Sequence, residues 1–171
     1  CAPTASVLGV GGMIEVKGLT KQYGNKKAID NISFTVRQGE ILGLLGLNGA
    51  GKSTTMNIIT GCLAASEGTV LIDGRDIRKD PIKAKEVIGY LPEIPPLYVD
   101  MRVREYLDFV CDLKKIKQKR KAHIQEVYEL AGIDHVRNRV IKNLSKGYRQ
   151  RVGLAAALIG NPDVLILDEP T

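Results

Sequence analysis

Apolar and polar residues alternate in two early segments of the chain, 14–17 and 32–36. Successive side chains of a strand point to opposite faces, so this period of two predicts antiparallel strands with one face open to water. The apolar residues at 70–72 continue the pattern and run into an Asp-Gly pair at 73–74, which is typical of a turn. We therefore expect an antiparallel β-subdomain at the N-terminal end.

Two other apolar runs, 41–45 and 164–167, lack this alternation. A continuous apolar run is typical of a parallel strand that is buried on both faces. The first run leads through a glycine-rich loop into residues 53–60, where we expect a helix that Gly61 ends.

The middle of the chain has the spacing of helices. Apolar residues recur every three or four positions in 103–113 and 124–131, and Gly132 is placed to end the second helix. A third helix is expected over 147–159, because the Asn-Pro pair at 161–162 stops it. The order is therefore strands, a helical insert, and a return to the central sheet.

Composition narrows the class of protein. The chain has 171 residues, enough to bury a core, and no apolar run near the roughly 20 residues that cross a bilayer. Its three cysteines are far apart, which argues against a zinc site or a disulfide scaffold and fits a reducing cytosol. The formal net charge of +6 suits either nucleic acid or phosphate ligands.

The two ends of the sequence have a character of their own. Residues 1–12 carry no charge and no clear periodicity, and Met13 begins the first patterned segment. We interpret 1–12 as a leader or an extension introduced by cloning, expected to be disordered; a remnant of a signal segment is the alternative, although no basic region precedes it. The sequence stops at Thr171 directly after an apolar strand, so we expect a domain that is incomplete at its C-terminal end.

The segment 46–53 is the first candidate for a ligand-binding site. It reads Gly-Leu-Asn-Gly-Ala-Gly-Lys-Ser and fits the P-loop pattern G-x-x-x-x-G-K-[ST] between a strand and a helix. Glycines let backbone N–H groups point at phosphate oxygens, and the helix N-terminus adds its positive end. Lys52 can reach the β- and γ-phosphates, Ser53 can bind Mg²⁺, and Thr54 can add a phosphate contact. A chance glycine-rich turn is the alternative, which the strand and helix context disfavours.

An acidic pair follows the last apolar run. In a P-loop protein the end of such a strand lies near the loop, where a carboxylate can hold Mg²⁺. Adjacent strand residues point in opposite directions, so the two acids take different roles. We expect Asp168 to hold the metal and Glu169 to be the general base that polarises the attacking water.

Further motifs resemble the ATP-binding cassette (ABC) family. Residues 144–151, Leu-Ser-Lys-Gly-Tyr-Arg-Gln-Arg, resemble the family signature LSGGQ; 88–93 resemble the Q-loop; and Tyr23 stands where the family stacks an aromatic ring on adenine. The resemblance covers 13–171 and implies an α/β fold: a P-loop NTPase core with a mixed or parallel sheet, an N-terminal antiparallel β-subdomain and a helical subdomain at about 92–150.

The resemblance implies an ATPase that works as a head-to-tail dimer, with ATP and Mg²⁺ held between the P-loop of one copy and the signature of the other. Lys52 and Glu169 are then the catalytic candidates, and Ser53, Asp168 and Glu93 the metal ligands. The cofactor-binding candidates are Tyr23, Asn48, Gly49, Ala50, Gly51, Lys52, Ser53, Thr54, Ser145 and Gly147.

Three residues depart from the family pattern. Lys146 replaces the first signature glycine, Tyr148 replaces its glutamine, and Glu93 replaces the Q-loop glutamine. A carboxylate at Glu93 can still bind Mg²⁺ or water, although it repels phosphate. The family's D-loop and switch histidine would follow Thr171, so we expect this chain by itself to bind ATP poorly or not to hydrolyse it.

Two functions remain open. The first is the ATP-binding subunit of a transporter, at the cytoplasmic face of the cell membrane beside a separate transmembrane permease; the stretch 92–98 resembles the exporter branch. The second is a soluble ABC ATPase that acts on the ribosome or on nucleic acid. The basic stretch 114–121 mildly favours the second, but a solvated loop is the simpler interpretation, so a nucleic-acid partner is not expected.

Overall fold

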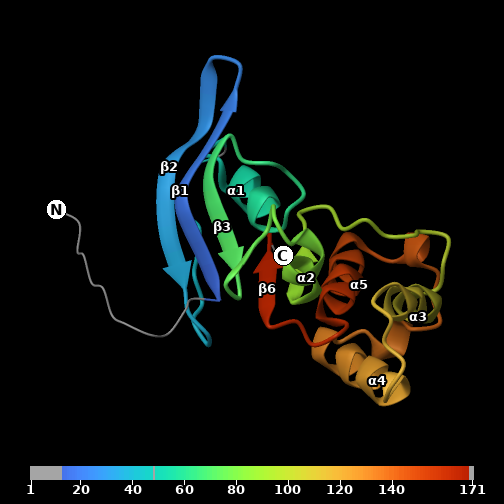
Figure 1. The fold of residues 1–171 in the computed structure, drawn as a ribbon. Coiled ribbons are helices and arrows are strands. Elements are labelled where there is room, and N and C mark those ends of the chain that lie inside the picture. Colours follow the sequence, from blue (N-terminus) through green and yellow to red (C-terminus); the bar gives the residue numbers. More distant parts are fainter. Residues whose placement is uncertain (1–12, 48, 170–171) are drawn as a thin grey trace. The chain divides into compact units, whose positions relative to one another are not determined.

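The computed structural model describes residues 13–47 and 49–169, which form two compact units (Figure 1). The first unit ends at Lys85 and the second begins at Glu86. The expected leader, 1–12, lies outside the described residues. None of the helices in the described part of the chain is long and apolar enough to cross a membrane.

The first unit is mainly antiparallel sheet, with strand order β2-β1-β3-β4. A short helix, α2, reaches the boundary between the units. The elements are β1 (Ile14–Tyr23), β2 (Lys26–Val36), α1 (Lys52–Ile59), β3 (Glu67–Ile72), β4 (Arg75–Asp76) and α2 (Pro81–Glu86).

The strand register of this sheet gathers the alternating apolar residues on one face. Ile14 pairs with Ile72 and Val16 with Val70, and all four side chains are buried. The residues at 73–74 both have positive φ, 48° and 72°, and join β3 to β4 as a type I′ turn does. The predicted antiparallel subdomain and its turn are therefore confirmed.

The prediction of a buried parallel strand at 41–45 is wrong for this structure. These residues have no regular secondary structure, and Ile41 and Leu45 are 97% and 96% exposed. A strand needs a neighbour that pairs its backbone N–H and C=O groups. Within the described residues no strand pairs with 41–45, so the apolar run alone does not form one.

The second unit is mainly helical. Three longer helices, two short 3-10 helices and a pair of strands make it up. The elements are β5 (Ile88–Leu91), α3 (Val103–Leu113), α4 (Arg120–Ala131), η1 (Asp134–Val136), η2 (Ile141–Asn143), α5 (Lys146–Leu158) and β6 (Val164–Leu167).

The helices of this unit share one apolar core, and the three predicted helices are confirmed. Val103 and Leu107 of α3, Val127 of α4 and Val152 of α5 are almost fully buried in it. Gly132 follows α4 in the left-handed conformation and ends it, as expected. Figure 1 shows α3, α4 and α5 gathered together.

The strands β5 and β6 pair in parallel, so the predicted parallel strand at 164–167 is confirmed. Its expected burial on both faces is wrong: Val164 and Ile166 are buried, whereas Leu165 is 42% exposed. Leu165 pairs with Gly89, on the face that α5 covers, but within the described residues no strand pairs with the outer edge of β6. The pairing positions Asp168, whose backbone N–H donates to the Leu91 carbonyl at 2.9 Å.

Candidate nucleotide-binding site

Glycines shape the P-loop in the first unit. Gly49 and Gly51 have φ of 82° and 85°, in the left-handed region that favours glycine. A Cβ atom on Gly51 would lie 2.3 Å from the carbonyl oxygen of Ala28, so no larger residue fits there. Gly51 therefore lets the chain turn directly into α1, which begins at Lys52.

The first turn of α1 presents hydrogen-bond donors beside this loop. The N–H groups that open a helix have no partner within it, and they carry the positive end of the helix dipole. The Lys52 ammonium group donates to the carbonyls of Gly46 and Leu47 at 2.7 and 3.1 Å, so it lies against the loop. Ser53 is exposed at the same turn. Ammonium, N–H and hydroxyl groups fit the β- and γ-phosphates and Mg²⁺ of a nucleotide.

Two further predicted contacts are less defined. Asn48 lies outside the described residues. Tyr23 ends β1 and is 52% exposed, and the Lys21 ammonium group lies 5.1 Å from its ring centre. The stacking of this ring on adenine stays a prediction.

The acidic pair lies at the end of β6, in two different environments. Asp168 is 5% exposed, whereas Glu169 is exposed and has φ of 47°. The two carboxylates thus differ in solvent access, and their separate roles stay predictions. No group of three or more His, Cys, Asp or Glu side chains within the described residues could hold a metal. Mg²⁺ typically takes only one or two protein carboxylates and completes its shell with phosphate and water.

The signature residues form the first turn of α5. Ser145 caps the helix, and its hydroxyl oxygen accepts the backbone N–H of Tyr148 at 3.3 Å. Ser145, Lys146 and Gly147 are exposed, and a Cβ atom on Gly147 would meet nothing within 4 Å. The exposed turn offers one hydroxyl and the free N–H groups of a helix start to an anion.

The structure brings Glu93 of the Q-loop together with this helix. The side-chain amide of Gln150 donates to the backbone carbonyl of Glu93 at 3.1 Å, and Gln150 is 5% exposed. The sequence alone did not predict a contact between Gln150 and Glu93. A single polar residue on the apolar side of a helix was the available signal, because a buried amide needs hydrogen-bond partners.

The basic stretch 114–121 forms the connection after α3 and the start of α4. Arg120 forms ion pairs with Asp108 and Asp112, and the Lys114 ammonium group donates to the Ile159 carbonyl at 2.5 Å. Its remaining lysines are exposed. Part of the charge therefore stabilises the connection, which agrees with a solvated loop.

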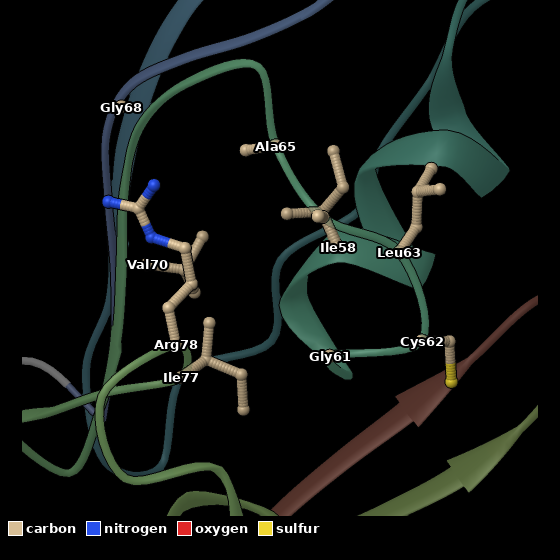
Figure 2. A pocket seen from close by; sticks show the side chains of 10 residues that line it. Ile58, Gly61, Cys62, Leu63, Ala65, Gly68, Val70, Ile77 and Arg78 are labelled. Carbon is tan, nitrogen blue, oxygen red and sulfur yellow. The ribbon is translucent and has the colours of Figure 1, made fainter.

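A pocket of about 270 Å³ lies in the first unit, near the C-terminal end of α1 (Figure 2). Ile58 and Leu63 line one side of it, and Val70, Ile77 and Arg78 the other. None of the predicted nucleotide-binding residues lines this pocket.

The P-loop, the helix that follows it and the parallel strand with an acidic end define a P-loop nucleotide-binding protein of α/β class. The family model described as ABC transporter matches residues 29–171, and the chain belongs to this family. The expected fold class is confirmed by its similarity to MJ0796, described as a dimeric structure of a bacterial ABC transporter cassette. That likeness has a TM-score of 0.83 and 28% sequence identity, and covers 93% of this chain and 75% of that one.

Proteins of similar sequence are also ATP-binding proteins of transporters. The ABC transporter ATP-binding protein YhcH of Bacillus subtilis is 43% identical over 93% of this chain and 52% of its own length. The bacitracin transport ATP-binding protein BcrA of Bacillus licheniformis is 38% identical over 93% and 51%. The lipopolysaccharide export system ATP-binding protein LptB of Haemophilus influenzae is 38% identical over 92% and 67%. The chain spans about half the length of the first two relatives.

Proposed function

We propose that this chain is the nucleotide-binding part of an ABC transporter, which binds and hydrolyses MgATP to drive export through a separate transmembrane permease. The observation that carries the proposal is the P-loop: left-handed glycines, the close approach at Gly51, and an ammonium group held against the loop at the start of α1. A loop of this kind surrounds phosphate with N–H donors and positive charge.

The proposal assigns roles to the side chains around the nucleotide. Lys52 neutralises the β- and γ-phosphates, and Ser53 and Asp168 bind Mg²⁺. When bound, the metal supplies charge that stabilises the transferring phosphoryl group. The exposed carboxylate of Glu169 accepts a proton from the attacking water. Glu93 stays a candidate ligand for Mg²⁺ or water.

A second cassette completes the proposed active unit. Ser145 and Gly147 lie on an open surface, and the described part of the chain gives no steric reason for a glycine at position 147. An approaching ligand supplies that reason. We propose that this turn contacts the γ-phosphate held by the P-loop of the second copy, identical or not. The dimeric cassette MJ0796 supports such a pair.

A membrane permease is the proposed second partner, which would place the protein at the cytoplasmic face of the membrane. Ile94, Tyr98 and Val99 follow the Q-loop segment and are 82%, 58% and 43% exposed. Exposed neighbouring apolar side chains favour a protein contact. The roles of BcrA in bacitracin transport and of LptB in lipopolysaccharide export support transport, and export in particular.

The exposed lysines at 115–121 keep the second candidate open, a soluble ABC ATPase that acts on the ribosome or on nucleic acid. The two candidates differ in what the full-length protein binds. A detergent-solubilised membrane protein that co-purifies with it supports transport. Association that ribonuclease abolishes supports the alternative.

An equilibrium titration with MgATP tests the common core of both. We expect the full-length protein to bind MgATP and its Lys52→Ala variant to lose at least tenfold in affinity, because the variant removes the charge that faces the phosphates. Lys79→Ala, at an exposed lysine between β4 and α2, is the matched control for the loss of one positive charge. Equal binding by Lys52→Ala and the parent would refute the P-loop assignment.

A further inference from the structure

Tyr148 is the third residue of α5, where the family signature has a glutamine, and it makes an unusual number of contacts for an exposed first turn. Its hydroxyl lies 3.0 Å from Nε2 of His135. The two rings meet edge to face with centres 5.5 Å apart, and the Arg151 guanidinium lies 5.5 Å from the tyrosine ring centre. Its backbone N–H donates to the hydroxyl oxygen of Ser145.

The contact partner His135 is itself firmly placed. His135 belongs to η1, the 3-10 helix that follows α4. Ile133, just before η1, and Val136, its last residue, are almost completely buried. The Val136 N–H donates to the Ile133 carbonyl at 3.0 Å. The imidazole therefore stands on a backbone that the apolar core of the second unit holds in place.

The turn that Tyr148 belongs to is held at its two ends, where Leu144 is buried and the Arg149 N–H donates to the Ser145 carbonyl at 2.9 Å, and Tyr148 packs partly against the apolar core. Ser145, Lys146 and Gly147 are exposed, and the space beside Gly147 is open. The glycine also gives the backbone of this turn more freedom than any other residue would. The hydroxyl oxygen of Ser145 accepts from Tyr148, which leaves its own hydrogen free to donate outward.

We propose that His135 is a positioning residue for the signature turn. By fixing the side chain of Tyr148 it holds the Ser145 hydroxyl and the Gly147 N–H group in the orientation that receives the γ-phosphate bound to the second cassette. The inference rests on the proposed function, and it gives a reason for the tyrosine that replaces the signature glutamine. Preorganised donors bind an anion more tightly because less freedom is lost on binding.

The test is ATP-driven dimerisation of the full-length protein, measured by sedimentation velocity with MgATP. Glu169→Gln is the background throughout, because loss of the proposed base keeps ATP intact. His135→Ala and His135→Phe remove the hydrogen bond, and the second keeps a ring. His135→Gln offers a hydrogen-bonding group at similar reach without the ring, and Tyr148→Phe removes only the hydroxyl.

We expect His135→Ala, His135→Phe and Tyr148→Phe each to weaken dimerisation about three- to fivefold, which is the effect of one hydrogen bond. His135→Gln should recover most of the loss. His135→Phe combined with Tyr148→Phe should lose no more than either alone, because both remove the same hydrogen bond. MgATP binding to the single chain should not change.

His123 provides a matched control. Its Nε2 accepts the backbone N–H of Gly160 at 2.9 Å, just beyond the other end of α5. His123→Ala should lower stability and leave dimerisation unchanged. Equal dimerisation by the His135 variants and the parent, or an equal loss in His123→Ala, would overturn the positioning role alone. If the parent does not dimerise with MgATP, or if Lys52→Ala dimerises as well as the parent, the proposed function is overturned and this inference with it.

Discussion

Substitutions at two glycines of α5 can test the stability of this helix separately from its proposed function. A Cβ atom on Gly153 would lie 2.6 Å from the Cβ of Pro95 and 2.8 Å from a methyl carbon of Leu91. Carbon atoms in contact prefer about 3.5–4.0 Å. Leu91 is 1% exposed, so it has no room to move. Gly147, on the same helix, has open space at its Cβ position.

The expected changes in stability therefore have opposite signs. Gly153→Ala gains about 1 kcal/mol of helix propensity and loses about 1–3 kcal/mol to overpacking, a net destabilisation of about 1 kcal/mol. Gly147→Ala meets no clash and gains up to about 1 kcal/mol. Each kcal/mol corresponds to about 2–4 °C in Tm for a protein of this size. Thermal unfolding followed by circular dichroism measures both variants against the parent.

At Gly147 the proposed function should weaken although the stability of the helix increases. Its added methyl group projects into the open surface where the nucleotide of the second cassette is proposed to bind. We expect Gly147→Ala to raise Tm by a few degrees and to weaken MgATP-driven dimerisation of the full-length protein at least tenfold. A rise in Tm for Gly153→Ala would refute the packing argument. Unchanged dimerisation in Gly147→Ala would refute the role of the signature turn.

Three other predictions follow from single side chains. Glu169→Gln should slow ATP hydrolysis by the full-length protein at least 100-fold while MgATP binding persists, because general-base catalysis contributes about 10²–10⁴-fold; phosphate release measures it, and hydrolysis at the parent rate would exclude Glu169 as the base. Burial raises the pKa of Tyr128 to about 12 from 10.0. The unfolded chain then loses its proton first, so the free energy of unfolding should fall as pH rises from about 10 to about 12, and urea titrations should show a smaller fall in Tyr128→Phe. Cys62 is exposed, whereas burial raises the pKa of the Cys111 thiol. In a Cys1→Ser background one thiol should react quickly with a disulfide reagent and the second only after unfolding; two equally fast thiols would contradict the burial of Cys111.

The sequence alone determined the features that depend on neighbours in the chain. The glycines of the P-loop and the glycine that ends α4 follow from backbone conformations that only a few residue types adopt. The alternation at 14–17 fixed a face of the antiparallel sheet, because the side-chain period of a strand is two. The family motifs at 46–53 and 144–151 were also readable from the sequence, because each is a run of adjacent residues.

Only the tertiary structure decided the features that depend on distant partners. The apolar run at 41–45 reads as a buried strand, yet strand formation requires pairing with another segment, which an apolar run does not specify. Gln150 contacts Glu93 across 57 positions, and His135 contacts Tyr148 across 13. These contacts exist because tertiary packing in the second unit places α5 beside β5 and η1, and no local pattern in the sequence encodes that packing.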